Sequence, residues 1–509
     1  MAGTIPAPSR TGFRGNDRLL LGIVLGVVTF WLFAGTTGTV APNILADVNG
    51  AYSDPVHKTW ANPLIDVSAM NLAVSVTALF SGMFIVVAGG LADRVGRVRI
   101  SLIGNGLGIL GSLMIVLAAG PLALPLMLGG RAVQGLSAAC IMPATMALVK
   151  AYWDGPGRQR AVSMWSIGSW GGSGLASIFG GYVSTFVGWR WIFVASIVIS
   201  VISILLMRGT PESKVAQTDT AKFDFAGVAV FMVSMLALMV VLIFGAKIGW
   251  LTTTTIGLFA VAVVGLSLLV RVEKRSAKPF IDFALFGNRT FTGATISNFL
   301  LNGAIGLLIV TQQLLQIAGG MKASEAGLLT IGYAVAIIAF IRIGEKLLQR
   351  FGPRRPMVWG SLIVGVATVL LLPTNLLLSE YRWLAVLAYA LFGLGLAFYA
   401  TPSTDAALAN LPADQAGAGS GIYKMASSLG GAIGAAVSLA LFTAYSSTGA
   451  QFVGDVLVNQ GRTDNTAVRQ AAVVALVFNL VMVVIAVVSI MATVPKGRER
   501  AEAQAPAHD

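Results

Sequence analysis

Long apolar stretches alternate with short polar or charged breaks along almost the whole chain. A membrane-spanning helix needs about 20 apolar residues, and fourteen stretches come close to or exceed that length. In chain order they cover residues 19–43, 66–90, 100–118, 122–150, 161–186, 190–208, 225–246, 252–270, 291–318, 323–348, 356–376, 383–410, 417–446 and 469–493. The pattern predicts an all-α polytopic membrane protein with fourteen transmembrane helices.

Two longer polar segments, 209–224 and 271–289, divide these stretches into groups of six, two and six. We therefore expect an N-terminal six-helix half (1–208), a linker with two extra helices (209–290), and a C-terminal six-helix half with a cytoplasmic tail (291–509).

Three short sequence matches between the two halves occur in the same order and at an almost constant separation. They indicate that the two halves are repeats. The run 92–99 (ADRVGRVR) resembles 348–355 (LQRFGPRR), Pro143 matches Pro402, and the glycine pair 171–172 matches the pair 430–431. Together they predict two homologous six-helix units with the two extra helices inserted between them.

The charge pattern indicates how the chain is oriented. Most of the 34 Lys and Arg residues fall in the loops on the side of the two termini, and 56% of the chain is hydrophobic. Basic loops remain on the cytoplasmic side of a membrane. We therefore expect both termini in the cytoplasm, in the inner membrane of a bacterium, and we interpret the net charge of +13 as topology rather than as a nucleic-acid footprint.

Few residues offer cofactor or catalytic chemistry. The chain has one cysteine, Cys140, and its two histidines lie outside the apolar stretches, so we expect no metal site. No phosphate-binding G-x-x-x-x-G-K-[ST] loop occurs, which leaves an ion gradient as the simplest energy source. We expect no cofactor and no enzymatic activity. The expected partners are the lipid bilayer, protons and a small amphipathic substrate, and the chain should be a monomer.

The loop between the second and third stretches, residues 89–99, reads GGLADRVGRVR. It resembles the signature loop of the major facilitator superfamily. Its glycines permit a tight turn, and its acid can hold one conformation through a charge-assisted hydrogen bond. The resemblance implies a conformational latch formed by Gly89, Asp93, Arg94, Gly96, Arg97 and Arg99. The alternative interpretation is a basic anchor loop, which does not explain the acid.

Two further stretches resemble motifs of the drug:proton antiporters in this superfamily. Arg131 opens the run RAVQG inside the fourth stretch, where a charge is costly unless it faces a cavity or a partner. In the fifth stretch, small residues recur every four positions and permit close helix contact, at Gly168, Gly172, Ala176 and Gly180. The usual proline of that motif is absent here, and packing alone can explain the small-residue stripe.

The six-two-six plan and these motifs together resemble the fourteen-helix drug:proton antiporters. The strings GRAVQGLSAACIMPAT, SIGSWGGSG, GWRWIF, SNFLLNGA, YATPSTDAALAN and GIYKMASSLGG look most like the NorB-type quinolone and multidrug exporters. The resemblance implies the major facilitator fold and proton-coupled efflux by alternating access. The hydrophilic stretch 47–65 looks longer than in that group.

A proton carrier needs a titratable group in a partly desolvated place. The first stretch has no acid, and the other acids of the N-terminal half fall in loops or at span ends. The acids well inside predicted spans lie in the C-terminal half. We expect Asp405 with Lys424 to form the proton-linked switch, and Glu345, beside Arg342, to be the second candidate. Arg131 joins them as a candidate on the strength of its motif. A static ion pair near the interface remains the alternative for each pair.

A multidrug cavity needs large apolar walls with few polar contacts. The candidate lining residues are Trp31, Phe33, Trp165, Trp170, Asn298, Asn302, Gln312, Tyr399 and Tyr423. Three other functions stay open: a carrier for a defined metabolite such as an organic acid or sugar, a peptide symporter, for which the expected E-x-x-E-R run is absent, and a non-transporting membrane scaffold or sensor.

Overall fold

All regular structure in the described part of the chain is helical, as the apolar pattern predicts. The computed structural model describes residues 13–50, 63–153, 157, 160–161, 164–165, 168–169, 172–214, 225–249, 251–274, 281, 283–408, 411, 416–448 and 464–496. The side chains of residues 31–34 and of Asp93 fall outside this description.

The first group of helices comes from the N-terminal part of the chain. It contains α1 (Asp17–Val48), α2 (Val67–Val95), α3 (Arg97–Val116), the short 3-10 helix η1 (Gly120–Leu122), α4 (Ala123–Tyr152), α6 (Gly172–Phe186) and α7 (Arg190–Met207). Helix α4 packs against α2 and α3, while α1 packs against α6 and α7.

The second group comes from the C-terminal part. It contains η3 (Phe283–Gly287), α10 (Arg289–Gly303), α11 (Gly306–Ile317), α12 (Ala323–Leu328), α13 (Ile331–Phe351), α14 (Arg354–Leu370), α15 (Leu378–Leu408), α16 (Ala416–Thr448) and α18 (Thr466–Thr493). Helix α15 packs against α13 and α14, and α18 packs against α10, α14 and α16.

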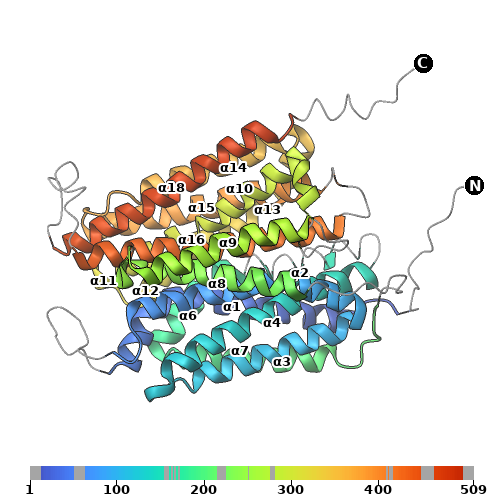
Figure 1. Ribbon diagram of the computed structural model, residues 1–509, viewed down its shortest axis with the longest axis horizontal. Coiled ribbons are helices and arrows are strands. Elements are labelled where there is room, and N and C mark those ends of the chain that lie inside the picture. Colours follow the sequence, from blue (N-terminus) through green and yellow to red (C-terminus); the bar gives the residue numbers. More distant parts are fainter. Residues whose placement is uncertain are drawn as a thin grey trace, which may run out of the picture.

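Helices α8 (Phe225–Ile248) and α9 (Thr253–Glu273) pair with each other between these groups in the sequence. In Figure 1, α14, α15 and α18 lie on one side, α3, α4 and α7 lie on the other, and α8 lies between them. Helix α8 contacts both α2 and α16. The six-two-six order and the domain boundaries at 208 and 290 stay predictions.

Eleven helices in the described residues are long and apolar enough to cross a membrane, and α1 is a twelfth if its two parts form one span. In this count α10 and α11 make one span, as do α12 and α13. The remaining two predicted spans correspond to α6, of which 15 residues are described, and to α14, which has 17 residues. The multi-span architecture is confirmed, and the count of fourteen stays a prediction.

Short polar side chains and glycines set the helix ends. Asn16 accepts a hydrogen bond from the backbone of Leu19 at 2.8 Å and begins α1, and Asp66 begins α2 in the same way. Gly96 ends α2 with φ at +135°, and Gly352 ends α13 with φ at +70°. The two glycines that the repeat aligns therefore have the same task, because both supply a backbone conformation that disfavours a side chain.

The small-residue stripe brings α6 close to α1. A methyl group added to Gly180 would lie 2.0 Å from Thr36 Cγ2, and the Thr36 hydroxyl donates a hydrogen bond to the Ala176 carbonyl at 3.2 Å. The expected close helix contact is confirmed. The same helix also reaches the other group, because a methyl group on Gly181 would lie 2.2 Å from the Ala323 carbonyl oxygen.

Candidate functional site

A polar cavity lies among α10, α15 and α16 of the second group. Its lining contains Asn298 and Asn302 from α10, Leu396, Tyr399, Ala400 and Thr404 from α15, and Tyr423, Lys424 and Ser427 from α16. Four of the nine residues expected to bind substrate thus meet in one place, together with the lysine expected to take part in coupling. The sequence interpretation places these residues on three predicted spans that are expected to line a substrate cavity.

Hydrogen bonds fix the walls of this cavity. The Tyr423 hydroxyl donates to Ser403 at 2.8 Å, and Ser403 donates to the Tyr399 hydroxyl at 2.8 Å. The Tyr399 and Ser297 hydroxyls are 2.7 Å apart. The Asn298 amide donates to the Tyr423 carbonyl at 2.9 Å. All these donors and acceptors are buried, so the network holds α10, α15 and α16 in one arrangement.

The acid and the base expected to form the proton switch lie on adjoining parts of this site. Lys424 is half-buried and lines the cavity. Asp405 is half-buried and directly follows Thr404, which is another lining residue. Both side chains take part in interactions within the protein.

Arg342 and Glu345 lie elsewhere, on the outer surface of α13, where both are exposed. Within the described residues, neither makes a hydrogen bond or an ion pair, so the structure does not contain the pair that their spacing suggested.

Arg131 is fully buried inside the first group. Its guanidinium donates to the carbonyls of Ala73 at 2.9 Å and Val74 at 3.3 Å, and to the Gln134 side chain at 3.1 Å. Thr77 in turn donates to the Arg131 carbonyl at 2.8 Å. These contacts fasten α4 to α2 and satisfy a charge that would otherwise be costly in the membrane. A second small cavity adjoins this network, and it is lined by Thr29, Phe30, Thr77, Gly108, Gln134 and Ser137.

The other expected substrate residues are spread more widely. Trp165 is buried and donates to Thr145 at 3.0 Å, within the first group. Gln312 is buried on α11 and accepts a hydrogen bond from Thr39 of α1, so it joins the two groups. Trp170 and the side chains of Trp31 and Phe33 lie outside the described residues.

The expected latch loop has an unforeseen partner in the connector that follows α7. The Glu212 carboxylate accepts hydrogen bonds from the backbone of Val98 at 2.8 Å and of Arg99 at 3.1 Å. Ser213 adds two contacts to Arg97, through its carbonyl at 3.1 Å and its hydroxyl at 3.2 Å. Glu212 thereby caps the start of α3, where the N-cap residue, Gly96, has no side chain to do so. The Asp93 side chain lies outside the described residues.

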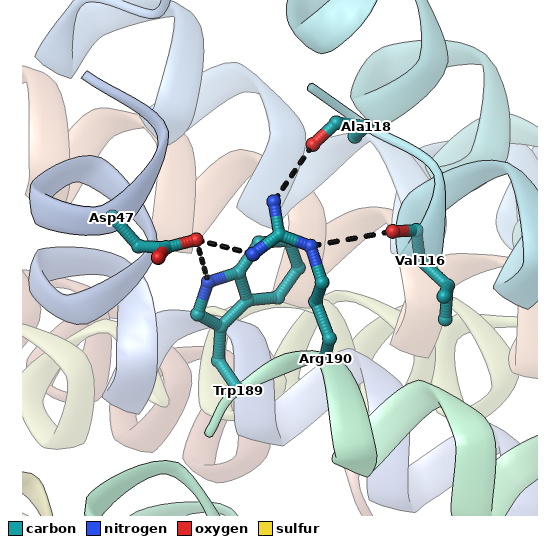
Figure 2. A network of polar contacts seen from close by, with 5 residues as sticks. All are labelled: Asp47, Val116, Ala118, Trp189 and Arg190. Carbon is teal, nitrogen blue, oxygen red and sulfur yellow. Dashed lines mark hydrogen bonds and ion pairs between the residues drawn. The ribbon is translucent and has the colours of Figure 1, made fainter. Parts of the chain in front are cut away.

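Arg190 lies at the ends of the helices that are opposite to the Glu212 contact. It connects α7 with the ends of α1 and α3 (Figure 2). It forms an ion pair with Asp47 at the end of α1 and donates to the carbonyls of Val116 at 3.3 Å and Ala118 at 3.1 Å, just after α3. Its guanidinium also lies 4.3 Å from the centre of the Trp189 ring, and Trp189 donates to Asp47 at 3.0 Å.

Hydrogen bonds between the two groups, within the described residues, gather near this same end. Gln316 donates to the Thr39 carbonyl at 2.9 Å, beside the bond between Thr39 and Gln312. Asn71 at the start of α2 donates to Thr443 near the end of α16 at 2.8 Å. The backbone of Ser324 donates to Thr185 at 3.1 Å. The structure is therefore closed at the end that the basic-loop pattern assigns to the outside.

Sequence reasoning missed Glu212, Thr39 and the serines of the cavity. Glu212 could have been singled out from the sequence. It is an acid that closely follows the last apolar residue of a span, and it lies in a predicted cytoplasmic loop, where basic residues are more usual. Thr39 and Ser403 carried little signal, because hydroxyl residues are common in membrane helices and usually bond to their own helix.

Comparisons with known proteins agree with this architecture. Residues 23–435 and, in a second match, 283–508 fit the family model of the Major Facilitator Superfamily. Quinolone resistance protein NorB from Staphylococcus aureus (strain MRSA252) is 45% identical over 489 residues, which is 96% of this chain and 98% of that protein. The corresponding protein of strain COL is also 45% identical over the same shares of both chains.

Two solved structures share the fold. One is an auto-inhibited POT family peptide transporter, with a TM-score of 0.62 at 13% identity over 97% of this chain and 98% of that one. The other is the POT family transporter PepTSo, with a TM-score of 0.64 at 13% identity over 94% and 99%. The family match, the long relatives and the multi-span helical fold lead to one conclusion: this chain is a multi-pass membrane protein of the Major Facilitator Superfamily.

Proposed function

We propose that this chain is a proton-coupled exporter of amphipathic drugs, quinolones among them, in the cytoplasmic membrane of a bacterium. The observation that carries the proposal is the 45% identity, along 96% of the chain, to proteins named for quinolone resistance. The fold is consistent with it, because two helix groups that meet along one boundary can rock about a central site. The proposed transporter acts as a monomer.

The proposed orientation has both termini in the cytoplasm. It rests on the excess of basic residues in the loops on that side. In this orientation the bonds from Thr39 to Gln312 and from Asn71 to Thr443 close the outer end. The described conformation then precedes release of the substrate to the outside, which requires these bonds to break.

The proposed latch is the loop with Gly89, Asp93, Arg94, Gly96, Arg97 and Arg99. The Glu212 carboxylate and the Ser213 carbonyl support this role, because they bind the backbone of the loop where α3 begins. A loop held in this way can keep one position while the helix groups move.

The proposed proton switch is Asp405 with Lys424, and Glu345 with Arg342 is the second choice. Support for Asp405 comes from its place beside a polar cavity in the membrane part of the chain, which is where a carboxylate can exchange protons. Glu345 is exposed on α13 and away from that cavity. Arg131 is assigned to holding α2 and α4 in register near the pathway.

Drug susceptibility tests this proposal. Cells that lack their own efflux pumps would express the chain and be grown against norfloxacin, ethidium and a quaternary amine. We expect at least a fourfold rise in the inhibitory concentration of norfloxacin. A panel without any rise, with the protein present in the membrane, would contradict drug export and favour a carrier for a defined metabolite.

Labelling tests the orientation. Pro55→Cys and Gln460→Cys, each in a Cys140→Ser background, should react with a membrane-impermeant thiol reagent added outside intact cells. Val215→Cys should react only after the membrane is opened. Labelling of Val215→Cys from outside would invert the topology.

A further inference from the structure

The cavity among α10, α15 and α16 is lined mainly by neutral residues. Lys424 is the one charged residue among the described residues that line it. Asp405 follows the lining residue Thr404 but does not itself line the cavity. The cavity in the first group, near Arg131, has no charged residue in its described lining. A half-buried cation in a polar cavity favours a ligand that brings a negative charge.

The neutral groups of the lining add hydrogen-bond donors. The Tyr423 hydroxyl uses its proton on Ser403. The Asn298 amide has two hydrogens and uses one of them on the Tyr423 carbonyl. The Ser427 hydroxyl makes no hydrogen bond with another described residue. Lys424, Asn298 and Ser427 therefore present donors from two helices to one small space, as the recognition of a carboxylate requires.

We infer that Lys424, with Ser427 and Asn298, anchors the carboxylate group of substrates and so selects acidic and zwitterionic drugs over purely cationic ones. The inference rests on the proposed export function and names the chemical class that this site prefers. Quinolones such as norfloxacin carry a ring carboxylate that fits this requirement.

The present size of the cavity sets a condition on binding. Its volume of about 10 Å³ is close to the room that one water molecule needs. A carboxylate is larger, so α10, α15 or α16 moves apart before it enters, and Lys424 exchanges its present interaction for the substrate. The helix groups of a transporter supply such motion during each cycle.

The test compares norfloxacin with its ethyl ester, which lacks the carboxylate charge and is larger by one ethyl group, and with ethidium, a cation that has no carboxylate. Binding of each is measured by tryptophan quenching on the full-length protein in nanodiscs at fixed pH. Lys424→Met keeps a long side chain without the charge, Lys424→Arg keeps the charge, and Ser427→Ala removes one donor. Thr368→Val is the control, because its hydroxyl bonds to the Val364 carbonyl of its own helix and Thr368 is not among the residues that line the cavity.

We expect Lys424→Met to weaken norfloxacin binding at least tenfold, which is the scale of losing a hydrogen bond to a charged group. Binding of the ester and of ethidium should change less than threefold. Lys424→Arg should keep most of the preference for norfloxacin over its ester, and Ser427→Ala should lose part of it.

An equal loss for all three probes would overturn the inference, since it would give Lys424 a structural role, and so would an unchanged norfloxacin affinity. The ester also reports whether Lys424→Met is folded, because it should still bind. If the wild-type protein binds none of the probes, the proposed drug export fails. If it binds all three and Lys424→Met does not discriminate, the carboxylate anchor alone fails.

Discussion

The carboxylate of Glu212 lies 2.8 Å from the backbone nitrogen of Val98, although 114 residues separate them in the chain. A methyl group on Gly96 would lie 2.4 Å from the carboxylate carbon of Glu212. The glycine of the signature loop therefore has two tasks: it takes a positive φ, and it leaves room for an acid from the connector. The start of α3 and the connector after α7 are held as one unit.

Glu212→Ala should weaken this unit. Loss of a helix-capping acid costs about 1 kcal/mol, so we expect a lower unfolding temperature in detergent and reduced drug export at normal protein abundance. Glu212→Gln should retain part of the cap, because its amide oxygen can still accept a hydrogen bond. Lys214→Ala, an exposed neighbour, is the control. If Glu212→Ala and Lys214→Ala have the same unfolding temperature and the same drug export, the contact between Glu212 and the loop does not contribute to stability or function.

Arg190 should matter more than its partner Asp47. Arg190→Ala removes the ion pair together with two bonds to backbone carbonyls, whereas Asp47→Asn removes only the charge of a half-exposed acid. Exposed ion pairs contribute about 0–1 kcal/mol, and each lost hydrogen bond about 1 kcal/mol. Thermal unfolding should rank wild type, Asp47→Asn and Arg190→Ala in order of falling stability.

The exposed Arg382→Ala should match wild type and serves as the control for removing an arginine. If the Arg190→Ala protein is as stable as the Arg382→Ala protein, the contacts of Arg190 shown in Figure 2 do not stabilise the helix ends.

The bond between Thr39 and Gln312 should bias the transporter towards closure at the outer end. Gln312→Met removes it at similar side-chain volume, and a loss of about 1 kcal/mol shifts a two-state equilibrium roughly fivefold. Ile309→Cys, beside Gly38 at the same boundary, should then react faster with an impermeant thiol reagent added outside. Thr311→Val is the matched control, since its hydroxyl bonds within its own helix. Identical labelling rates in the two variants would show that Gln312 does not stabilise closure at the outer end.

Arg131→Lys should behave as a structural defect. Lysine cannot reproduce a guanidinium that donates in three directions, so we expect a stability loss of about 2 kcal/mol together with weaker drug binding. Arg208→Lys, at an exposed position, should be neutral. Normal stability and drug binding in Arg131→Lys, with only proton-linked transport lost, would instead make Arg131 a coupling residue.

Several features of the fold could be predicted because local chemistry decides them. The apolar pattern located the helices, and the echo of Gly96 in Gly352 identified two equivalent helix ends that both need a positive φ. Pro143 and Pro402 likewise lie inside corresponding helices, α4 and α15. The spacing of Ala176 and Gly180 predicted a close contact, and Thr36 of α1 supplies it.

The site could be predicted only in part, because its contacts join distant segments. Tyr399 and Tyr423 were chosen as single residues, but their common serine, Ser403, emerges only when α15 and α16 pack. Two of the partners of Arg131 are backbone carbonyls, which leave no mark in a sequence. The spacing of Arg342 and Glu345 suggested a pair that the described structure does not contain, since both side chains are exposed.

The most direct measurement of the central claim records drug and proton movement together in proteoliposomes. Norfloxacin added to the wild-type protein should move protons in the opposite direction. Asp405→Asn should abolish that movement while drug binding persists, because the amide keeps the shape of the acid but cannot titrate. Glu345→Gln should exchange normally. Normal proton exchange in Asp405→Asn, together with its loss in Glu345→Gln, would contradict the account and move the coupling site to α13.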